Sequence, residues 1–358
     1  MPNLAVPLTL ALLAAAPEQT PLPIKPDKDP RLELLDAMRT ELDRNHRQLR
    51  LNGHEAPYFL SYQVKDYDQR EVSGRFGALF TDGAWRDRQV YVDVRVGSYE
   101  FDNSTDEGLE FNFSNKGTSY VTKKTAPLDD DPLALRSALW LITDEKYKAA
   151  LFDYLKKKGE NVYAVEDPKR PPSFSREAPS VEIQHPLPFS FARERWTRLA
   201  RTLSATFNAY PEIFDGEVRV TGDKMVRYFV SSEGSRIVTE ETLFGVHLTA
   251  MTRADDGQLL DNSRDYYAPL ESQLPGDAAL FSEAKKMIQE LLALRRAPAI
   301  DPYTGPAILA PEAAGVLFHE AVGHRLEGER QNDDNEGKTF RGQVGRPVLP
   351  SLDRKSVV

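Results

Sequence analysis

The chain has 358 residues, no cysteine and a formal net charge of −9, and 40% of its residues are hydrophobic. The absence of cysteine excludes a disulfide scaffold, a zinc ribbon and a thiol enzyme within this chain. The length allows two or three domains, and the composition is that of a globular protein. An acidic chain repels phosphate backbones, so we expect no direct binding to nucleic acid.

The first residues resemble a targeting segment. Residues 4–16 are mostly apolar and end in three alanines before Pro17, which is the small-residue pattern of a signal-peptidase site. We therefore predict a signal peptide at residues 1–16 and export to the periplasm. Signal peptides usually carry a lysine or arginine before the apolar run, and none is present here, so the alternative is a cytoplasmic protein in which residues 1–16 are not a signal peptide. The run is too short to span a bilayer, so no stable membrane span is expected.

Two proline clusters divide the chain, because each proline fixes φ and biases the preceding residue away from helix. We predict a proline-rich linker at 17–30, an N-terminal α/β domain at 31–165, a second linker at 166–189, a central α/β domain at 190–298 and the start of a C-terminal catalytic domain at 299–352.

The hydrophobic spacing predicts helices and strands in consecutive runs. Helices are expected at residues 32–49, 131–158, 191–210 and 277–296, the last capped by Asp277, and another begins at Pro311. Strands are expected at residues 59–65, 72–80, 90–96, 218–220, 225–230, 237–242, 244–250 and 307–309, with breaks at 221–223 and 232–234. The predicted fold class is α+β, with mainly antiparallel sheets and flanking helices.

One stretch, residues 315–328, carries recognisable chemistry. His319 is followed directly by Glu320, and His324 lies five residues after the first histidine. Neutral imidazoles suit Zn²⁺, and a neighbouring carboxylate can take a proton from a metal-bound water. Zinc-peptidase helices usually place their histidines at i and i+4.

The five-residue spacing does not fit a regular α-helix. At about 100° per residue, the second imidazole would point about 140° away from the first. A π-type turn brings such a pair closer to one face, and Gly323 can relax the helix locally. We therefore predict a bulge or break between Ala321 and His324.

Other acidic and histidine residues have ordinary interpretations. His247 has the opposite parity to the apolar residues of its strand, and we expect a surface or sheet-face histidine rather than a ligand. The pairs Asp255-Asp256 and Glu240-Glu241 are expected to be solvated.

The stretch 315–328 resembles the zinc helix of the TldD/PmbA (modulator of DNA gyrase) metalloproteases, which reads HExxxH with a glycine before the second histidine and Leu-Glu-Gly after it. Residues 228–234 also resemble that family's strand ending in a Ser-Ser-Glu-Gly turn. The resemblance implies that His319 and His324 are Zn²⁺ ligands and that Glu320 is the catalytic base. It implies a TldD-like fold, unfolded or extended peptides as substrates, and a homodimer or a heterodimer with a related subunit.

The chain departs from the family at its end. Family members continue into a sheet that supplies a cysteine as third zinc ligand, and this chain has no cysteine. We expect a C-terminally truncated product with an incomplete site, in which residues 353–358 are a non-native tail and Val316, Leu317 and Val322 lose cover. Glu327, three residues after His324, is an alternative third ligand, although a salt-bridged or capping role is favoured.

Three functional readings compete. The first is a zinc-dependent metallopeptidase in which Glu320 activates a metal-bound water. The second is a non-catalytic, peptide-binding partner subunit of a TldD-like assembly, since a sheet can take an extended peptide as an added strand. The third is a structural domain with an accidental HExxxH. An intact Glu320 beside an imidazole favours the first.

Overall fold

The computed structural model describes residues 29–104, 124–161, 172–328, 339–340, 342–343 and 345–348. The expected signal peptide, most of the first linker and the suspected tail lie outside the described residues. None of the helices in the described ranges is long and apolar enough to cross a membrane.

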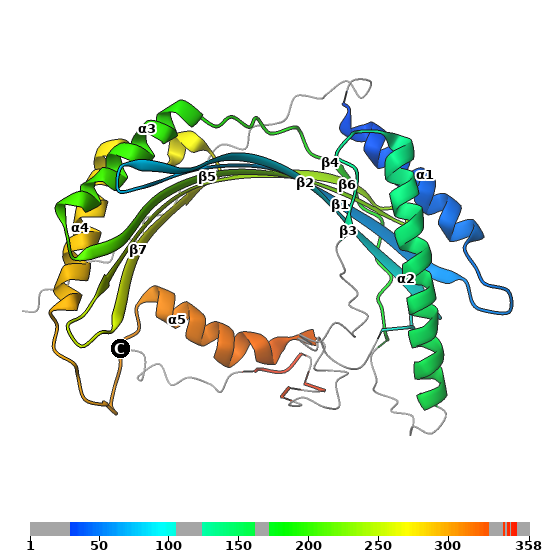
Figure 1. Cartoon of the computed structure of the whole chain (residues 1–358). Coiled ribbons are helices and arrows are strands. Elements are labelled where there is room, and N and C mark those ends of the chain that lie inside the picture. Colours follow the sequence, from blue (N-terminus) through cyan, green and yellow to red (C-terminus); the bar gives the residue numbers. More distant parts are fainter. Residues whose placement is uncertain are drawn as a thin grey trace, which may run out of the picture.

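One curved sheet organises the molecule (Figure 1). Its strand order is β3-β2-β1-β5-β6-β4, and β7 also pairs with β6. The strands are β1 (Pro57–Arg75), β2 (Ala78–Val96), β3 (Lys124–Thr125), β4 (Val181–Ile183), β5 (Ile213–Ser231), β6 (Arg236–Arg253) and β7 (Leu259–Ala268). All pairs are antiparallel except β4 with β6, so the predicted α+β class with mainly antiparallel strands is confirmed.

Four helices cover the convex face of the arch, and α5 lies beneath its concave face (Figure 1). The helices are α1 (Arg31–Gln48), α2 (Pro132–Asn161), α3 (Arg193–Ser204), α4 (Asp277–Arg295) and α5 (Pro311–Phe318). Helices α1 and α2 cover one end of the sheet, and α3 and α4 cover the other. Each was predicted within a few residues, but Gly276 rather than Asp277 occupies the N-cap of α4.

Several strand predictions were wrong in detail. The expected strand 72–80 contains the β1–β2 hairpin turn at Phe76 and Gly77, both of which have positive φ. The expected break at 221–223 lies inside the continuous β5, where Gly222 passes within contact of the Phe191 ring. The turn at 232–234 is confirmed. Strand β7 was not predicted, β4 lies inside the second proline cluster, and residues 307–309 form no strand.

The convex face carries two apolar cores. Alternate residues of each strand point to the same face of a sheet, so Tyr62 and Val72 of β1 both face the helices. Tyr62 lies in a first core beneath α1 and α2, whereas Val72 lies in a second core beneath α3 and α4 around the buried Trp196. The predicted domain division at 166–189 stays a prediction, but strands from before and after it pair in one sheet, β1 with β5.

Buried ion pairs lie on the convex face between the two cores. Glu240 on β6 has a side chain only 1% exposed, and it accepts from Arg31 at 2.8 Å and pairs with Lys224 at 2.8 Å. The expectation that Glu240 is solvated was therefore wrong, because its parity points it under α1, while the adjacent Glu241 is exposed. Arg88 is also buried and pairs with Asp66 and Asp130.

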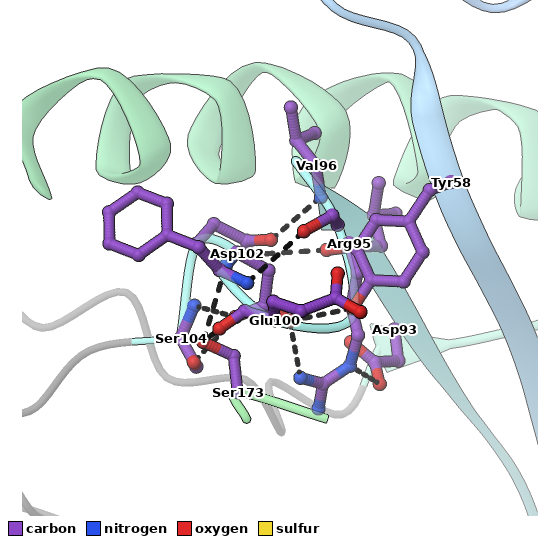
Figure 2. Close-up of polar contacts among 12 residues, drawn as sticks. Tyr58, Asp93, Arg95, Val96, Glu100, Asp102, Ser104 and Ser173 are labelled. Atoms are coloured by element: carbon purple, nitrogen blue, oxygen red, sulfur yellow. Dashed lines mark hydrogen bonds and ion pairs between the residues drawn. The ribbon is translucent and has the colours of Figure 1, made fainter. Parts of the chain in front are cut away.

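A carboxylate fixes the loop that follows β2 (Figure 2). Asp102 is fully buried and accepts from the Tyr58 hydroxyl at 2.8 Å, from Arg95 at 3.0 Å and from the backbone of Ser104 at 2.7 Å. Burial acts to raise the pKa of Asp102, but the hydrogen bonds from Ser104 and the charge of Arg95 outweigh it, so the pKa is lowered from its usual value. Ionised Asp102 therefore holds the loop against the end of the sheet.

Candidate metal centre

Helix α5 begins where the sequence predicts. Pro311 occupies the first turn, where its missing N–H costs nothing, and Glu312 places a negative charge at the positive end of the helix. Helix α5 ends at Phe318, and the chain continues without leaving helical dihedrals into a π-helical turn at His319–Gly323 and a 3-10 turn at His324–Leu326.

The π-helical turn confirms the predicted bulge. The backbone N–H of His324 donates to the carbonyl oxygen of His319, five residues earlier, which is the hydrogen bond that defines a π-helix. Gly323 keeps right-handed helical dihedrals, φ −53° and ψ −59°. A Cβ at Gly323 would lie 3.8 Å from Nδ1 of His319, which is an ordinary contact. Neither the dihedral angles nor the space at this position requires a glycine in the turn.

The turn brings the three predicted site residues together. The rings of His319 and His324 have centroids 4.5 Å apart and planes inclined at 73°. One oxygen of Glu320 lies 3.9 Å from Nε2 of His319, and the other lies 3.6 Å from Nε2 of His324. One potential ligand atom from each residue lies within 4.8 Å of the others. Both Nε2 atoms therefore lie near the oxygens of one carboxylate, and the three groups are close enough together to hold one metal ion.

Glu327 contacts the far side of one imidazole. Its Oε1 lies 2.6 Å from Nδ1 of His324. A carboxylate on Nδ1 accepts its proton and leaves Nε2 with a lone pair, which is the usual arrangement behind a metal-ligating histidine. Glu327 thus lies against His324 as a hydrogen-bond partner, and its alternative role as a third ligand stays a prediction.

The donor set suits Zn²⁺ but does not complete a site. Two imidazoles and one adjacent carboxylate match the ligand types that zinc takes, whereas catalytic zinc sites normally have three protein ligands. The group is also open to solvent, because the side chains of His319 and Glu320 are 64% and 63% exposed. The two histidines therefore fit Zn²⁺ as two ligands of a site that requires at least one more.

Among the described residues, those that lead into the motif are exposed to solvent. Residues 296–321 are all exposed, and the apolar side chains of α5 include Val316 at 62% and Leu317 at 54%. The expected exposure of these two residues is confirmed, while Val322 is half-buried.

His247 lies apart from this group, as predicted. It is on β6, with its Nδ1 2.7 Å from Oδ1 of Asp265, the residue directly opposite on β7. It faces the concave side and is 8% exposed, so it is a sheet-face histidine, more buried than a surface one. Asp255 and Asp256 are exposed in the turn before β7, as expected.

Sequence reasoning missed the buried charges of the sheet. Asp66 and Arg88 occupy positions whose parity matches the apolar residues of β1 and β2, and so does Glu240 on β6. Charged residues at core-facing positions were the available signal, because such groups are seldom buried without partners.

No family model matches the chain, and no curated protein matches it in sequence. A protein described as a modulator of a DNA gyrase from Thermotoga maritima has a similar shape, with 8% identity and a TM-score of 0.39 over 70% of this chain and 47% of that one. For another described as a modulator of DNA gyrase, from Bacteroides thetaiotaomicron, the identity is 8% and the TM-score 0.41, over 73% and 49%.

TldE from Thermococcus kodakarensis is also similar in shape, with 12% identity and a TM-score of 0.39 over 71% of this chain and 47% of that chain. The chain spans about half the length of each of these solved structures. Over about 70% of its length, this chain is structurally similar to modulator-of-DNA-gyrase (TldD/PmbA) proteins and TldE.

Proposed function

We propose that this chain carries the metal-binding helix of a zinc-dependent metallopeptidase of the TldD/PmbA type, which hydrolyses unfolded or extended peptides. The observation that carries the proposal is the π-helical turn, because it pairs the two histidines of an otherwise non-chelating spacing around Glu320. An accidental motif has no need of this local departure from the α-helix.

The roles follow from the geometry. His319 and His324 would hold the ion through Nε2, the atoms that face Glu320. Zinc, when bound, supplies a Lewis acid that polarises a peptide carbonyl and makes water more acidic. Glu320 takes a proton from the attacking water onto a carboxylate oxygen and returns it to the leaving amide nitrogen. Glu327 holds the His324 ring in the tautomer that leaves Nε2 available.

Metal binding is tested on the purified chain by competition with a zinc chelator. We expect His319→Ala and His324→Ala each to weaken zinc binding by at least about tenfold, since each removes one of few ligands. His54→Ala is the matched control, because His54 is an exposed histidine far from the motif in sequence. Equal affinity in all four proteins would remove the metal site and the peptidase with it.

Catalysis is tested with Glu320→Gln, which preserves the shape of the side chain and removes the base. We expect zinc binding to persist and, in an assembly where a further ligand completes the site, hydrolysis of an unfolded protein substrate to fall by about 100-fold or more, within the usual range for loss of a general base. Hydrolysis that survives this substitution would contradict the assigned role of Glu320.

A second candidate is peptide binding without hydrolysis. In the described part of the chain β7 pairs only with β6, so its other edge presents backbone groups to which an extended peptide can add. This reading predicts that an extended peptide binds the Glu320→Gln variant and the parent equally without being cleaved by either. Backbone N-methylation of the peptide should abolish such binding.

Two further proposals concern context. An identical or related second subunit is proposed from the sequence resemblance, and export is proposed from the apolar segment at residues 4–16. Fractionation of cells that express the full chain, with detection of a product shortened by about the length of a signal peptide, tests export.

A further inference from the structure

The outer face of α2 carries large apolar side chains that belong to neither of the two cores. Leu133 is 68% exposed, Leu141 61% and Phe152 67%, and Trp140 and Leu155 are also exposed. The opposite side of the same helix is buried against α1 and β2 through residues such as Leu139. We call Leu133, Trp140, Leu141, Phe152 and Leu155 the α2 stripe.

The stripe runs along one side of the helix. Its residues, together with Ser137, Asp144 and Lys148, follow one another at steps of mostly three or four, the spacing that keeps side chains on one helical face. Exposed apolar side chains scattered singly are ordinary, but a continuous stripe of this kind marks an interaction surface.

The stripe has two apolar halves separated by opposite charges. Leu133, Trp140 and Leu141 form the N-terminal half, and Phe152 and Leu155 form the C-terminal half. Between them, Nζ of Lys148 lies 2.6 Å from Oδ2 of Asp144, both on the exposed side. The sequence of surfaces along the stripe is apolar, charged and apolar, and it is the same when the helix is reversed.

We propose that the α2 stripe is a two-fold interface between two copies of this chain, with the two α2 helices antiparallel. A two-fold contact requires a surface that is complementary to itself. Antiparallel helices related by an axis at the level of residue 146 place Asp144 opposite Lys148 of the second copy, in both directions. The same register places Trp140 opposite Phe152 and Ser137 opposite Leu155.

The charges at the helix ends select the antiparallel orientation. Asp129, Asp130 and Asp131 precede the first turn of α2, and Lys156, Lys157 and Lys158 lie near its end. Antiparallel packing brings the acidic end of one copy towards the basic end of the other and opposes the two helix dipoles. Parallel packing would place Asp144 against Asp144 and like ends together.

A hollow beside the stripe receives the second copy. It has a volume of about 260 Å³ and lies between α1 and α2, lined by Glu41, Arg44, Leu133, Arg136, Ser137 and Trp140. In the proposed register, Phe152 and Leu155 of the second copy lie opposite Trp140 and Ser137, at this hollow. Leu133 and Trp140 supply the apolar part of the lining against which these two side chains would pack.

The first test is sedimentation equilibrium of the full chain over a range of concentrations. We expect a reversible monomer–dimer equilibrium, which Phe152→Glu weakens by at least about 100-fold because it places a charge in an apolar contact. Circular dichroism checks that the exposed substitution leaves the fold intact. A chain that stays monomeric at every concentration, or a dimer that Phe152→Glu leaves unchanged, overturns the proposal.

The second test uses the charges. Asp144→Lys alone sets lysine against Lys148 of the second copy, and Lys148→Asp alone sets two aspartates together, so each variant should dimerise about tenfold more weakly. An equimolar mixture of the two variants should instead form a mixed dimer, because both cross-helix pairs are then opposite in sign. Homodimers as tight as the parent, or no gain on mixing, contradict the register.

The third test exploits the absence of cysteine. Ser137→Cys and Leu155→Cys chains are mixed under mild oxidation, and we expect a disulfide between the two different variants in preference to either variant with itself. Ser175→Cys, at an exposed position outside α2, gives the background rate. Preferential Ser137→Cys self-linkage would indicate parallel helices and reject the proposal. None of these outcomes depends on zinc binding, since the stripe and the histidine motif share no residue.

Discussion

His324 is hydrogen-bonded through its backbone N–H to the carbonyl oxygen of His319, so the two candidate ligands are also the two ends of one π-helical bond. The π-helical turn and the five-residue spacing of the two histidines are therefore two aspects of the same segment. One residue more than the usual motif lies between the histidines, and the wider turn takes it up without moving the rings to opposite sides.

Deletion of Ala321 tests this relationship. The shortened chain has its histidines at i and i+4, a spacing that already places two side chains on one face of a regular α-helix. We expect zinc affinity to stay within about threefold of the parent, since both imidazoles still converge. Insertion of an alanine after Ala321 should abolish the pairing. Chelator competition measures both, and loss of binding in the deletion variant would show that the π-helical turn itself is required.

Substitution of Glu327 tests the orientation of the His324 ring. Glu327→Gln removes the negative acceptor from Nδ1, and loss of such a partner typically costs about 10–100-fold in metal affinity. Glu312→Gln, an exposed change at the start of α5, is the control. Zinc titration supplies the comparison; identical affinities for the two variants would mean that Glu327 does not orient the ligand.

Gly74 of β1 lies against the backbone of α3. A Cβ at this position would be 2.5 Å from the carbonyl oxygen of Ala200, a backbone atom that cannot move away easily. We expect Gly74→Ala to lower the free energy of unfolding by about 1–3 kcal/mol, the usual range for overpacking. Gly328→Ala, with open space around it, should change stability by no more than about 0.5 kcal/mol. Urea unfolding measures both, and equal stabilities would contradict the close approach.

Glu240 and Glu241 are neighbours in sequence with opposite environments. Glu240→Ala leaves Arg31 buried with one partner fewer, and breaking a buried pair in this way costs about 3–5 kcal/mol. Glu241→Ala, on the exposed side of the same strand, should cost no more than about 0.5 kcal/mol. Similar losses for both variants would argue against the buried ion pairs as a structural element.

Asp102 predicts a pH dependence of stability. Because its pKa is lowered in the folded protein, its ionised form stabilises the fold above the unfolded pKa of about 3.9, and this contribution is lost as pH falls through the lower, folded pKa. The stability difference between the parent and Asp102→Asn should therefore be constant from neutral pH down to about 4 and shrink below it. Asp36→Asn, at an exposed position, should show no such trend.

The sequence predicted the elements better than their connections. Amphipathic spacing located α1 and α4 because three-to-four periodicity persists over many turns. Gly222 was misread as a break, since a glycine between polar residues resembles a turn, whereas its lack of a side chain admits the ring of Phe191 beside a continuous strand. The pairing of β1 with β5 depends on residues far apart in the chain, which no local pattern encodes.

The candidate site was predictable for a different reason. His319, Glu320 and His324 lie within six residues, so their geometry follows from one local turn that spacing and Gly323 both indicate. The contact of Glu327 with Nδ1 of His324 was open to prediction for the same reason. The buried network of Arg31 and Glu240 joins residues 209 positions apart and could not be read locally.

The antiparallel pairing of β1 with β5 has a consequence during synthesis. Tyr62 lies opposite Val230, so the inner edge of the β1–β2 hairpin has no partner until well over half of the chain has left the ribosome. Contacts this distant in sequence form slowly, and a long unpaired strand edge invites pairing with other chains. The nascent protein must therefore keep a 19-residue strand from aggregating while it waits, a task for which cells employ chaperones.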